Sequence, residues 1–146
     1  MPTDYTAALE HEHKLSDLAP SYIYEESPDF LFLYLGYTDI AGYKHSWMAP
    51  HYLEAVANAS HCIEKIMEYL PKNYNVCITA DHGGHHCTHN TDCMEDMIIP
   101  LICHGPIFQP NHLLANVNIK DIAPTLIQIL RLIPPSDWKW HYLLDH

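Results

Sequence analysis

The sequence predicts an α/β fold with a largely parallel sheet, and two observations support this. Three short apolar runs, at residues 30–35, 75–80 and 98–103, have the length of buried strands. Residues 50–70 and 121–130 instead repeat apolar side chains in steps of three and four, which is the period of a helix. Strands that alternate with helices are typical of α/β domains, in which the sheet is mostly parallel.

The first part of the chain has the weakest pattern. Residues 1–27 are mixed and polar and are a poorly defined N-terminal segment, for which we expect a short helix or a loose segment. Residues 30–35, Phe-Leu-Phe-Leu-Tyr-Leu, are apolar at every position, which favours a strand buried on both faces. Asp39 then lies at or just beyond the carboxyl end of that strand.

The next elements are bounded by clear signals. Pro50 suits the first turn of the helix at 50–70, and Pro71 ends it. The strand at 75–80 leads directly into Asp81 and His82.

The last strand and helix complete the alternation. Pro100 lies within the run at 98–103, so this strand is expected at an edge or a bulge. Asp121 has the position of an N-cap residue for the helix that runs through Leu130.

Charge excludes some classes of partner. The chain has 18 acidic and 7 basic residues, a formal net charge of −11. This argues against a nucleic-acid polymer and against an anionic membrane surface, because both attract Lys and Arg. An acidic chain can still bind phosphate esters if bound cations supply the positive charge.

The N-terminus and the cysteines suggest a location. The first residues show no signal peptide, and no apolar run reaches the roughly 18–20 residues needed to span a membrane. The five cysteines have no Cys-x-x-Cys spacing. We therefore expect a cytoplasmic protein with reduced thiols and no membrane partner.

Asp81 and His82 are the strongest candidates for chemistry. A carboxylate and an imidazole are both good ligands for Zn²⁺, and the two glycines that follow allow a sharp turn close to a ligand. Ligands in α/β sheets gather beyond the carboxyl ends of strands, where both Asp39 and Asp81 are expected. The alternative is a simple turn, with Asp81 capping the next segment and His82 on the surface.

More potential ligands follow in the loop after this pair. Three histidines lie within eight residues of Asp81, and we expect at least one to be only a solvated loop residue: His85, His86 and His89. Cys87 and Cys93 could also bind zinc, but without paired spacing they are interpreted, like Cys103, as ordinary thiols.

Three stretches of the chain resemble one known family. They are PDFLFLYLGYTDIAGYKHSWMAPHYLEAV, VCITADHGGHHCTHNTDCMEDMIIPLICHGPIF and VNIKDIAPTLIQILRL, in this order within about residues 28–140. Each is similar to a motif of the type I phosphodiesterase/nucleotide pyrophosphatase branch of the alkaline phosphatase superfamily.

The resemblance implies a fold and a reaction. The fold would be an alkaline-phosphatase-like three-layer core with a mostly parallel sheet, incomplete at the N-terminus. The reaction would be hydrolysis of phosphodiester or pyrophosphate bonds in a phosphate ester or nucleotide. The cofactors would be two divalent metal ions, with zinc expected first and manganese or magnesium as alternatives. Two such ions stabilise both the attacking and the leaving oxygens of phosphoryl transfer.

The same resemblance implies specific ligands. Asp39 matches a ligand of the first metal, and His89 is the best match for a later histidine of that metal. Asp81 and His82 match ligands of the second metal. In the family, a Thr or Ser nucleophile and one further Asp complete the site.

The chain departs from this pattern at one ligand. The family has a histidine four residues after the first Asp, where this chain has Tyr43. Tyrosine is a poor zinc ligand at neutral pH because its pKa is near 10. The first metal site is therefore weakened unless His45, two residues later, replaces the missing ligand.

No nucleophile is identified in this chain. Three hydroxyl residues near the N-terminus have no strand before them and are not assigned the role: Thr3, Thr6 and Ser16. We therefore interpret residues 28–146 as the C-terminal part of an alkaline-phosphatase-like domain. The chain is then either a fragment, completed by an N-terminal segment or a second chain, or a degenerate relative.

Three functions remain open. The first is a metal-dependent hydrolase module whose nucleophile is supplied from elsewhere. The second is a catalytically inactive metal-binding or interaction protein on the same fold. The third, ranked last, is a histidine-rich protein that buffers metal ions loosely through scattered side chains: His11, His13, His85, His86 and His104.

Overall fold

The computed structural model describes residues 5–139 and 141–144 and contains both helices and strands. This mixture agrees with the general α/β class predicted from the sequence. The described chain forms two compact units, which we treat separately. The first comprises residues 5–71 and 82–100, and the second comprises residues 72–81, 101–139 and 141–144.

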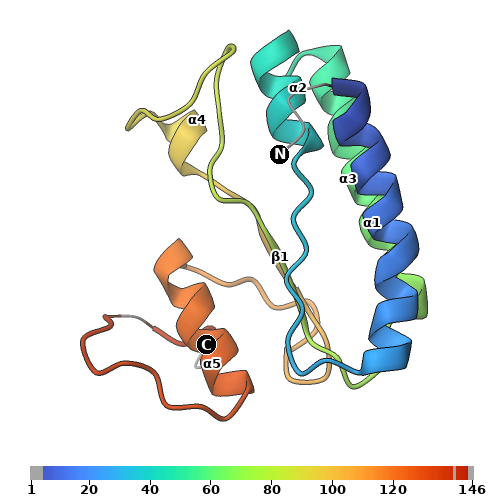
Figure 1. Cartoon of the computed structure of the whole chain (residues 1–146). Helices are drawn as coiled ribbons and strands as arrows, with labels where there is room; N and C mark the ends of the chain where they lie inside the picture. Colours follow the sequence, from blue (N-terminus) through green and yellow to red (C-terminus); the bar gives the residue numbers. More distant parts are fainter. Residues whose placement is uncertain (1–4, 140, 145–146) are drawn as a thin grey trace. The chain divides into compact units, whose positions relative to one another are not determined.

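The three longest helices of the first unit pack together. They are α1 (Tyr5–Glu26), α2 (Tyr37–His45) and α3 (Pro50–Tyr69). All three pack against one another, and α1 and α3 run side by side (Figure 1). Their shared core contains Ala8, Tyr37 and the fully buried Ala41 and Ala55.

The helix predicted at 50–70 is confirmed as α3. It begins at Pro50, whose missing amide N–H costs nothing in a first turn, and it ends at Tyr69, just before Leu70 and Pro71. Its buried face contains Ala55 and Cys62.

Glu12 connects α1, α2 and α3. This side chain of α1 is only 1% exposed. Its Oε1 accepts a hydrogen bond of 2.8 Å from the backbone N–H of Tyr37, the first residue of α2. Its Oε2 accepts a bond of 2.9 Å from Nδ2 of Asn58 in α3. The segment expected to be a short helix or loose therefore contains a 22-residue helix whose buried carboxylate positions α2.

Burial also affects the ionisation of Glu12. Loss of solvation raises the pKa of this carboxyl above its ordinary value, while the hydrogen bonds from Tyr37 and Asn58 lower it by less. A buried acid is retained here because two amide groups satisfy its oxygens.

The strand predicted at residues 30–35 is wrong. These residues form no strand, and Phe30 and Phe32 are 53% and 74% exposed. Burial alternates along the run, with Leu31 and Leu33 half-buried, as expected of an extended segment covered on one side. A strand needs a hydrogen-bonded partner, and no segment of the described chain pairs with this one.

The second unit contains a two-stranded sheet. Strands β1 (Val76–Thr79) and β2 (Leu101–His104) pair antiparallel, with Cys77 opposite Cys103. The mostly parallel sheet predicted from the sequence is not observed among the described residues. Pro100 lacks an amide N–H, and the pairing of the predicted strand at 98–103 starts only at the residue after it.

The helix predicted at 121–130 is confirmed as α5 (Ile122–Ile129), preceded by the short 3₁₀ helix η1 (Ile119–Asp121). Asp121 is the N-cap residue of α5, as the sequence predicted, although its side chain makes no capping hydrogen bond there. Asn118 is the N-cap of η1, and its side chain accepts from the N–H of Lys120. Asp121 is buried and accepts from the backbone of Asn118 at 2.8 Å and of His141 at 2.9 Å.

Among the residues that the structure describes, no helix has the length and apolar character needed to cross a membrane.

The role of Glu12 leads to a first prediction. Replacing Glu12 by Ala leaves the Tyr37 N–H and the Asn58 amide without a buried acceptor, which should lower the free energy of unfolding by about 1–3 kcal/mol. Urea denaturation measures this change. Glu10, which is exposed on the same helix, is the matched control, and Glu10→Ala should change the stability by less than about 0.5 kcal/mol. Equal effects of the two substitutions would contradict the role of Glu12.

Candidate metal centre

The indole of Trp47 joins α2 to the loop that follows β1. Trp47 is largely buried, and its backbone N–H donates a hydrogen bond of 2.7 Å to the carbonyl oxygen of His86. A Cβ atom added to Gly42 of α2 would lie 2.5 Å from the indole, and one added to Gly84 of the loop would lie 2.2 Å from it. Only glycine fits at these two positions, so the ring holds helix and loop in direct contact.

The same loop is tied down at its other end. The N–H groups of Gly83 and Gly84 donate to the carbonyl oxygens of Asp96 and Glu95, at 2.8 and 2.9 Å. These acceptors belong to the short helix α4 (Met94–Met97). The loop therefore leaves β1 with its backbone fixed at the residues that follow His82.

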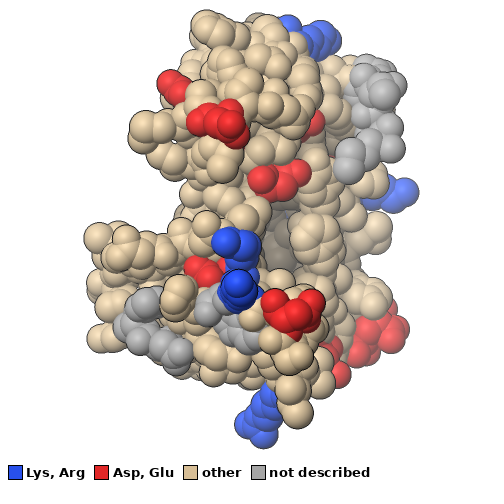
Figure 2. Space-filling view, turned by 90° about the vertical axis from the view of Figure 1, so that its left-hand side faces the viewer, with Lys and Arg blue, Asp and Glu red and all other residues tan. Residues whose placement is uncertain are grey.

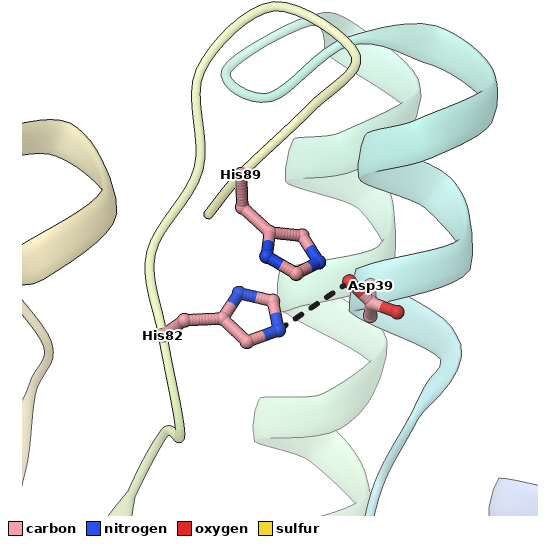
Figure 3. A group of neighbouring side chains, drawn as sticks. All are labelled: Asp39, His82 and His89. Atoms are coloured by element: carbon pink, nitrogen blue, oxygen red, sulfur yellow. Dashed lines mark ion pairs between the residues drawn. The ribbon is translucent and has the colours of Figure 1, made fainter. Parts of the chain in front are cut away.

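These constraints bring together three of the predicted ligands. Asp39, the third residue of α2, lies beside His82 and His89 of the loop (Figure 3). One potential ligand atom from each residue lies within 4.8 Å of the others, and all three residues are half-buried. We call this group the Asp39 cluster.

His82 presents a nitrogen to the Asp39 carboxylate. Its Nε2 lies 3.8 Å from Oδ1 of Asp39. Its Nδ1 lies 2.7 Å from the carbonyl oxygen of Gly83, and since a carbonyl only accepts, Nδ1 carries the proton. In the neutral imidazole, Nε2 then has the lone pair that a metal requires, and a backbone carbonyl fixes the tautomer as at many metal sites.

Two atoms of the cluster lack a hydrogen-bond partner. They are Oδ1 of Asp39 and Nδ1 of His89, which are the buried side-chain polar atoms left unsatisfied in the described residues. Unsatisfied buried polar atoms are costly, and a bound cation would remove this cost. An ion about 2.0–2.2 Å from each ligand can span the 3.8 Å gap between Asp39 and His82. The donor set therefore fits a divalent cation.

The rings of His82 and His89 set one requirement for such an ion. They stack with centroids 3.7 Å apart and planes inclined by 18°. Because imidazole ligands bind metals in the ring plane, an ion held by both histidines would turn one ring out of the stack.

Tyr43 contacts the cluster through His89. The Tyr43 hydroxyl forms a short hydrogen bond with Nε2 of His89, and the two rings meet at an angle of 63°. Tyr43 stands where the sequence resemblance led us to expect a histidine, and its hydroxyl bonds to a candidate ligand, His89. Neither this contact nor the one between His82 and the Gly83 carbonyl could be predicted from the sequence, because no sequence motif marks them.

Other candidate residues lie outside the Asp39 cluster. His45 packs its ring against Tyr5 and His51, at centroid distances of 5.2 and 4.6 Å. His86 is exposed, as predicted for at least one loop histidine. His85 instead lies 2.7 Å from Asp96.

Asp81, Thr6 and Ser16 are also not in the cluster. Asp81 is exposed and belongs to the second unit. Thr6 is exposed, and Ser16 is buried and donates to the carbonyl oxygen of His13. Thr3 lies outside the described residues.

Comparison with known families supports the sequence motifs. The family described as type I phosphodiesterase / nucleotide pyrophosphatase matches residues 1–122. The chain belongs to this family. The resemblance seen in the sequence is thereby confirmed, and the family match also includes the N-terminal segment that the quoted motifs left out.

Curated relatives give a second comparison. The chain is 25% identical over 140 residues to a 2,3-bisphosphoglycerate-independent phosphoglycerate mutase of Clostridioides difficile, covering 91% of the chain and 27% of the relative. It is 31% identical over 110 residues to the same kind of mutase from Laribacter hongkongensis, covering 69% of the chain and 21% of the relative.

A third relative carries a different enzyme name and aligns over a similar number of residues. A phosphopentomutase of Carboxydothermus hydrogenoformans is 33% identical over 113 residues, covering 77% of the chain and 29% of the relative. The chain thus spans only about a quarter of the length of the curated relatives it matches. No solved structure shows significant similarity to the chain.

The glycine at the Trp47 contact gives a second prediction. Gly84→Ala should push the loop away from α2, lower the free energy of unfolding by about 1–3 kcal/mol and weaken metal binding, because the added methyl overlaps the indole. Denaturation and metal titration measure the two effects. Gly36→Ala is the control, since its methyl would meet the ring of the partly exposed Tyr34, which can move. Similar metal affinity in Gly84→Ala and wild type would contradict this role.

The Asp39 cluster gives a third prediction. Mn²⁺ should raise the melting temperature of the wild type, by an amount equivalent to about 2.7 kcal/mol at one hundred times the dissociation constant. Mn²⁺ is chosen because it prefers oxygen and nitrogen ligands over thiols. Asp39→Asn should abolish most of this shift, whereas Asp29→Asn, at an exposed position, should keep it. An unchanged shift in Asp39→Asn would rule out the cluster as the Mn²⁺ site.

Proposed function

We propose that this chain contributes the metal-binding half of a hydrolase that cleaves phosphodiester or pyrophosphate bonds in a phosphate ester or nucleotide. One observation carries the proposal. Asp39 lies in α2, whereas His82 and His89 lie in the loop after β1, yet potential ligand atoms of the three residues lie within 4.8 Å of one another. Membership of the type I phosphodiesterase / nucleotide pyrophosphatase family gives the reaction class.

The relatives support the substrate class. Phosphoglycerate mutase and phosphopentomutase are names of proteins that act on phosphorylated small molecules. A small phosphate ester is therefore the substrate we propose for this chain as well.

The charge of the chain supports a cation at the site. A phosphate group approaching a chain with a net charge of −11 is repelled unless positive charge is supplied locally. On the face shown in Figure 2, acidic side chains are scattered and Lys and Arg form no broad patch. Divalent ions, zinc first with manganese or magnesium as alternatives, are the source of charge that we propose.

Each residue of the site has a proposed role. Asp39 and His89 would hold one ion, and His82 with its neighbour Asp81 would hold a second. Bound ions would polarise the phosphoryl group and stabilise the attacking and leaving oxygens. The Gly83 carbonyl keeps the His82 ring in one tautomer, and the Tyr43 hydroxyl orients His89.

The proposal leaves the nucleophile outside these residues. We assign it to no side chain of this chain and propose that a Thr or Ser from another segment or a second chain supplies it. We also propose that the complete domain has the alkaline-phosphatase-like three-layer core, with a mostly parallel sheet.

A second candidate function is a catalytically inactive metal-binding or interaction protein on the same fold. The Tyr43–His89 contact favours it, because Tyr43 stands where the family pattern has a metal ligand and bonds to another ligand instead. The two functions differ in whether bound metal leads to turnover.

The fourth prediction concerns activity. With Zn²⁺ or Mn²⁺, the chain alone or with a nucleophile-bearing segment of a family member should hydrolyse bis(p-nitrophenyl) phosphate. His82→Gln should reduce the rate by at least about 10–100-fold, the range found when residues supporting a metal centre are changed. His86→Gln, at an exposed position four residues away, should leave it unchanged. Metal binding without turnover under both conditions would support the inactive alternative and reject the hydrolase.

A further inference from the structure

We propose that His85, Cys93 and Asp96 form another metal site, distinct from the Asp39 cluster, that binds a soft divalent cation such as Zn²⁺ through a thiolate. Potential ligand atoms of the three residues lie within 4.8 Å of one another. We call this group the Cys93 cluster. It does not depend on the proposed hydrolase activity.

Both partners of His85 meet the same ring nitrogen. Nδ1 of His85 lies 2.7 Å from Oδ1 of Asp96 and 3.5 Å from Sγ of Cys93. A catalytic relay of Asp, His and Cys would place the carboxylate and the thiol on opposite nitrogens of the ring. The geometry therefore disfavours a cysteine nucleophile and leaves three donor atoms facing one point.

The separation of nitrogen and sulfur suits zinc. In a tetrahedral site with Zn–N of about 2.0–2.1 Å and Zn–S of about 2.3 Å, the two donors lie roughly 3.5 Å apart. The structure has 3.5 Å between Nδ1 and Sγ. The 2.7 Å between Nδ1 and Oδ1 is a hydrogen-bond length, so ion binding would open it by about 0.7 Å.

The carboxylate of this site is built in place. The Asp96 side chain is 3% exposed. Its Oδ2 accepts hydrogen bonds from the backbone N–H of Thr91 at 2.9 Å and from the Thr91 hydroxyl at 2.7 Å. These bonds orient the group so that Oδ1 remains for His85 or for an ion.

Asp96 is also ionised under ordinary conditions. Burial would raise its pKa, but the hydrogen bonds from His85 and Thr91 outweigh burial and hold the pKa well below its usual range. A negative ligand is therefore ready without loss of a proton.

Ion binding would release the proton of the Cys93 thiol to solvent as the S–metal bond forms, and His85 would bind through Nδ1 with its ring proton on Nε2. His85 and Cys93 are half-buried, so a water molecule can supply the fourth ligand.

Such an ion would brace the loop that carries the Asp39 cluster. The carbonyl oxygen of Asp96 already accepts from the N–H of Gly83, next to His82, and His85 N–H bonds to the carbonyl of Thr88, next to His89. An ion bound by His85, Cys93 and Asp96 would cross-link the side chains of this same loop. The role is structural and needs no substrate.

Co²⁺ titration of the full 146-residue chain is the test, because a cobalt–thiolate bond gives a near-ultraviolet charge-transfer band that carboxylate and imidazole ligands lack. We expect one such band in the wild type, with an intensity that saturates when one Co²⁺ is bound at the Cys93 cluster. The band should be lost in Cys93→Ser. Cys87→Ser, at an exposed thiol of the same loop, and Asp39→Asn should both keep it. No band in the wild type, or a band that persists in Cys93→Ser, overturns the proposal.

Alkylation provides a measurement that does not depend on a folded variant. In wild-type protein, Zn²⁺ should slow iodoacetamide modification of Cys93 at least tenfold and leave that of the exposed Cys87 unchanged, as read by mass spectrometry. Equal rates for Cys93 with and without Zn²⁺ would overturn the site, whatever the outcome of the phosphodiesterase assay.

Discussion

Close contact between the Trp47 indole and two glycines is the constraint on which the candidate centre depends. The ring lies where any side chain at Gly42 or Gly84 would overlap it, and it therefore sets the distance between α2 and the loop after β1. Asp39 comes from the helix, and His82 comes from the loop. Without this contact the two side chains would have no reason to meet, since they share no secondary structure.

Glu12 complements this contact at the first residue of α2. Its buried carboxylate holds the first N–H of the helix and an amide of α3. A single acidic residue in α1 thus orients the helix that presents Asp39. The candidate centre is therefore positioned partly by residues that are not themselves candidate metal ligands. This is usual for sites whose donors come from separate elements.

The sequence predicted α3 and α5 because proline and amphipathic spacing mark them locally. It failed at residues 30–35, because an apolar run is read as a strand whether or not a partner is present to pair with it. Asp39, His82 and His89 could be proposed from motif order, and the structure places them together. The Tyr43–His89 bond, the Gly83 carbonyl and the Cys93 cluster depend on how the loop folds back, which no local spacing encodes.

The three members of the Asp39 cluster are unevenly spread along the chain, and this has a consequence for assembly. His82 and His89 are separated by one short loop, whereas Asp39 must be brought in across a much longer stretch that includes all of α3. Closing the short loop loses less chain entropy. The two imidazoles can therefore come together while the helices are still unformed, whereas Asp39 joins them only once α2 has packed, so the cluster is completed late in folding.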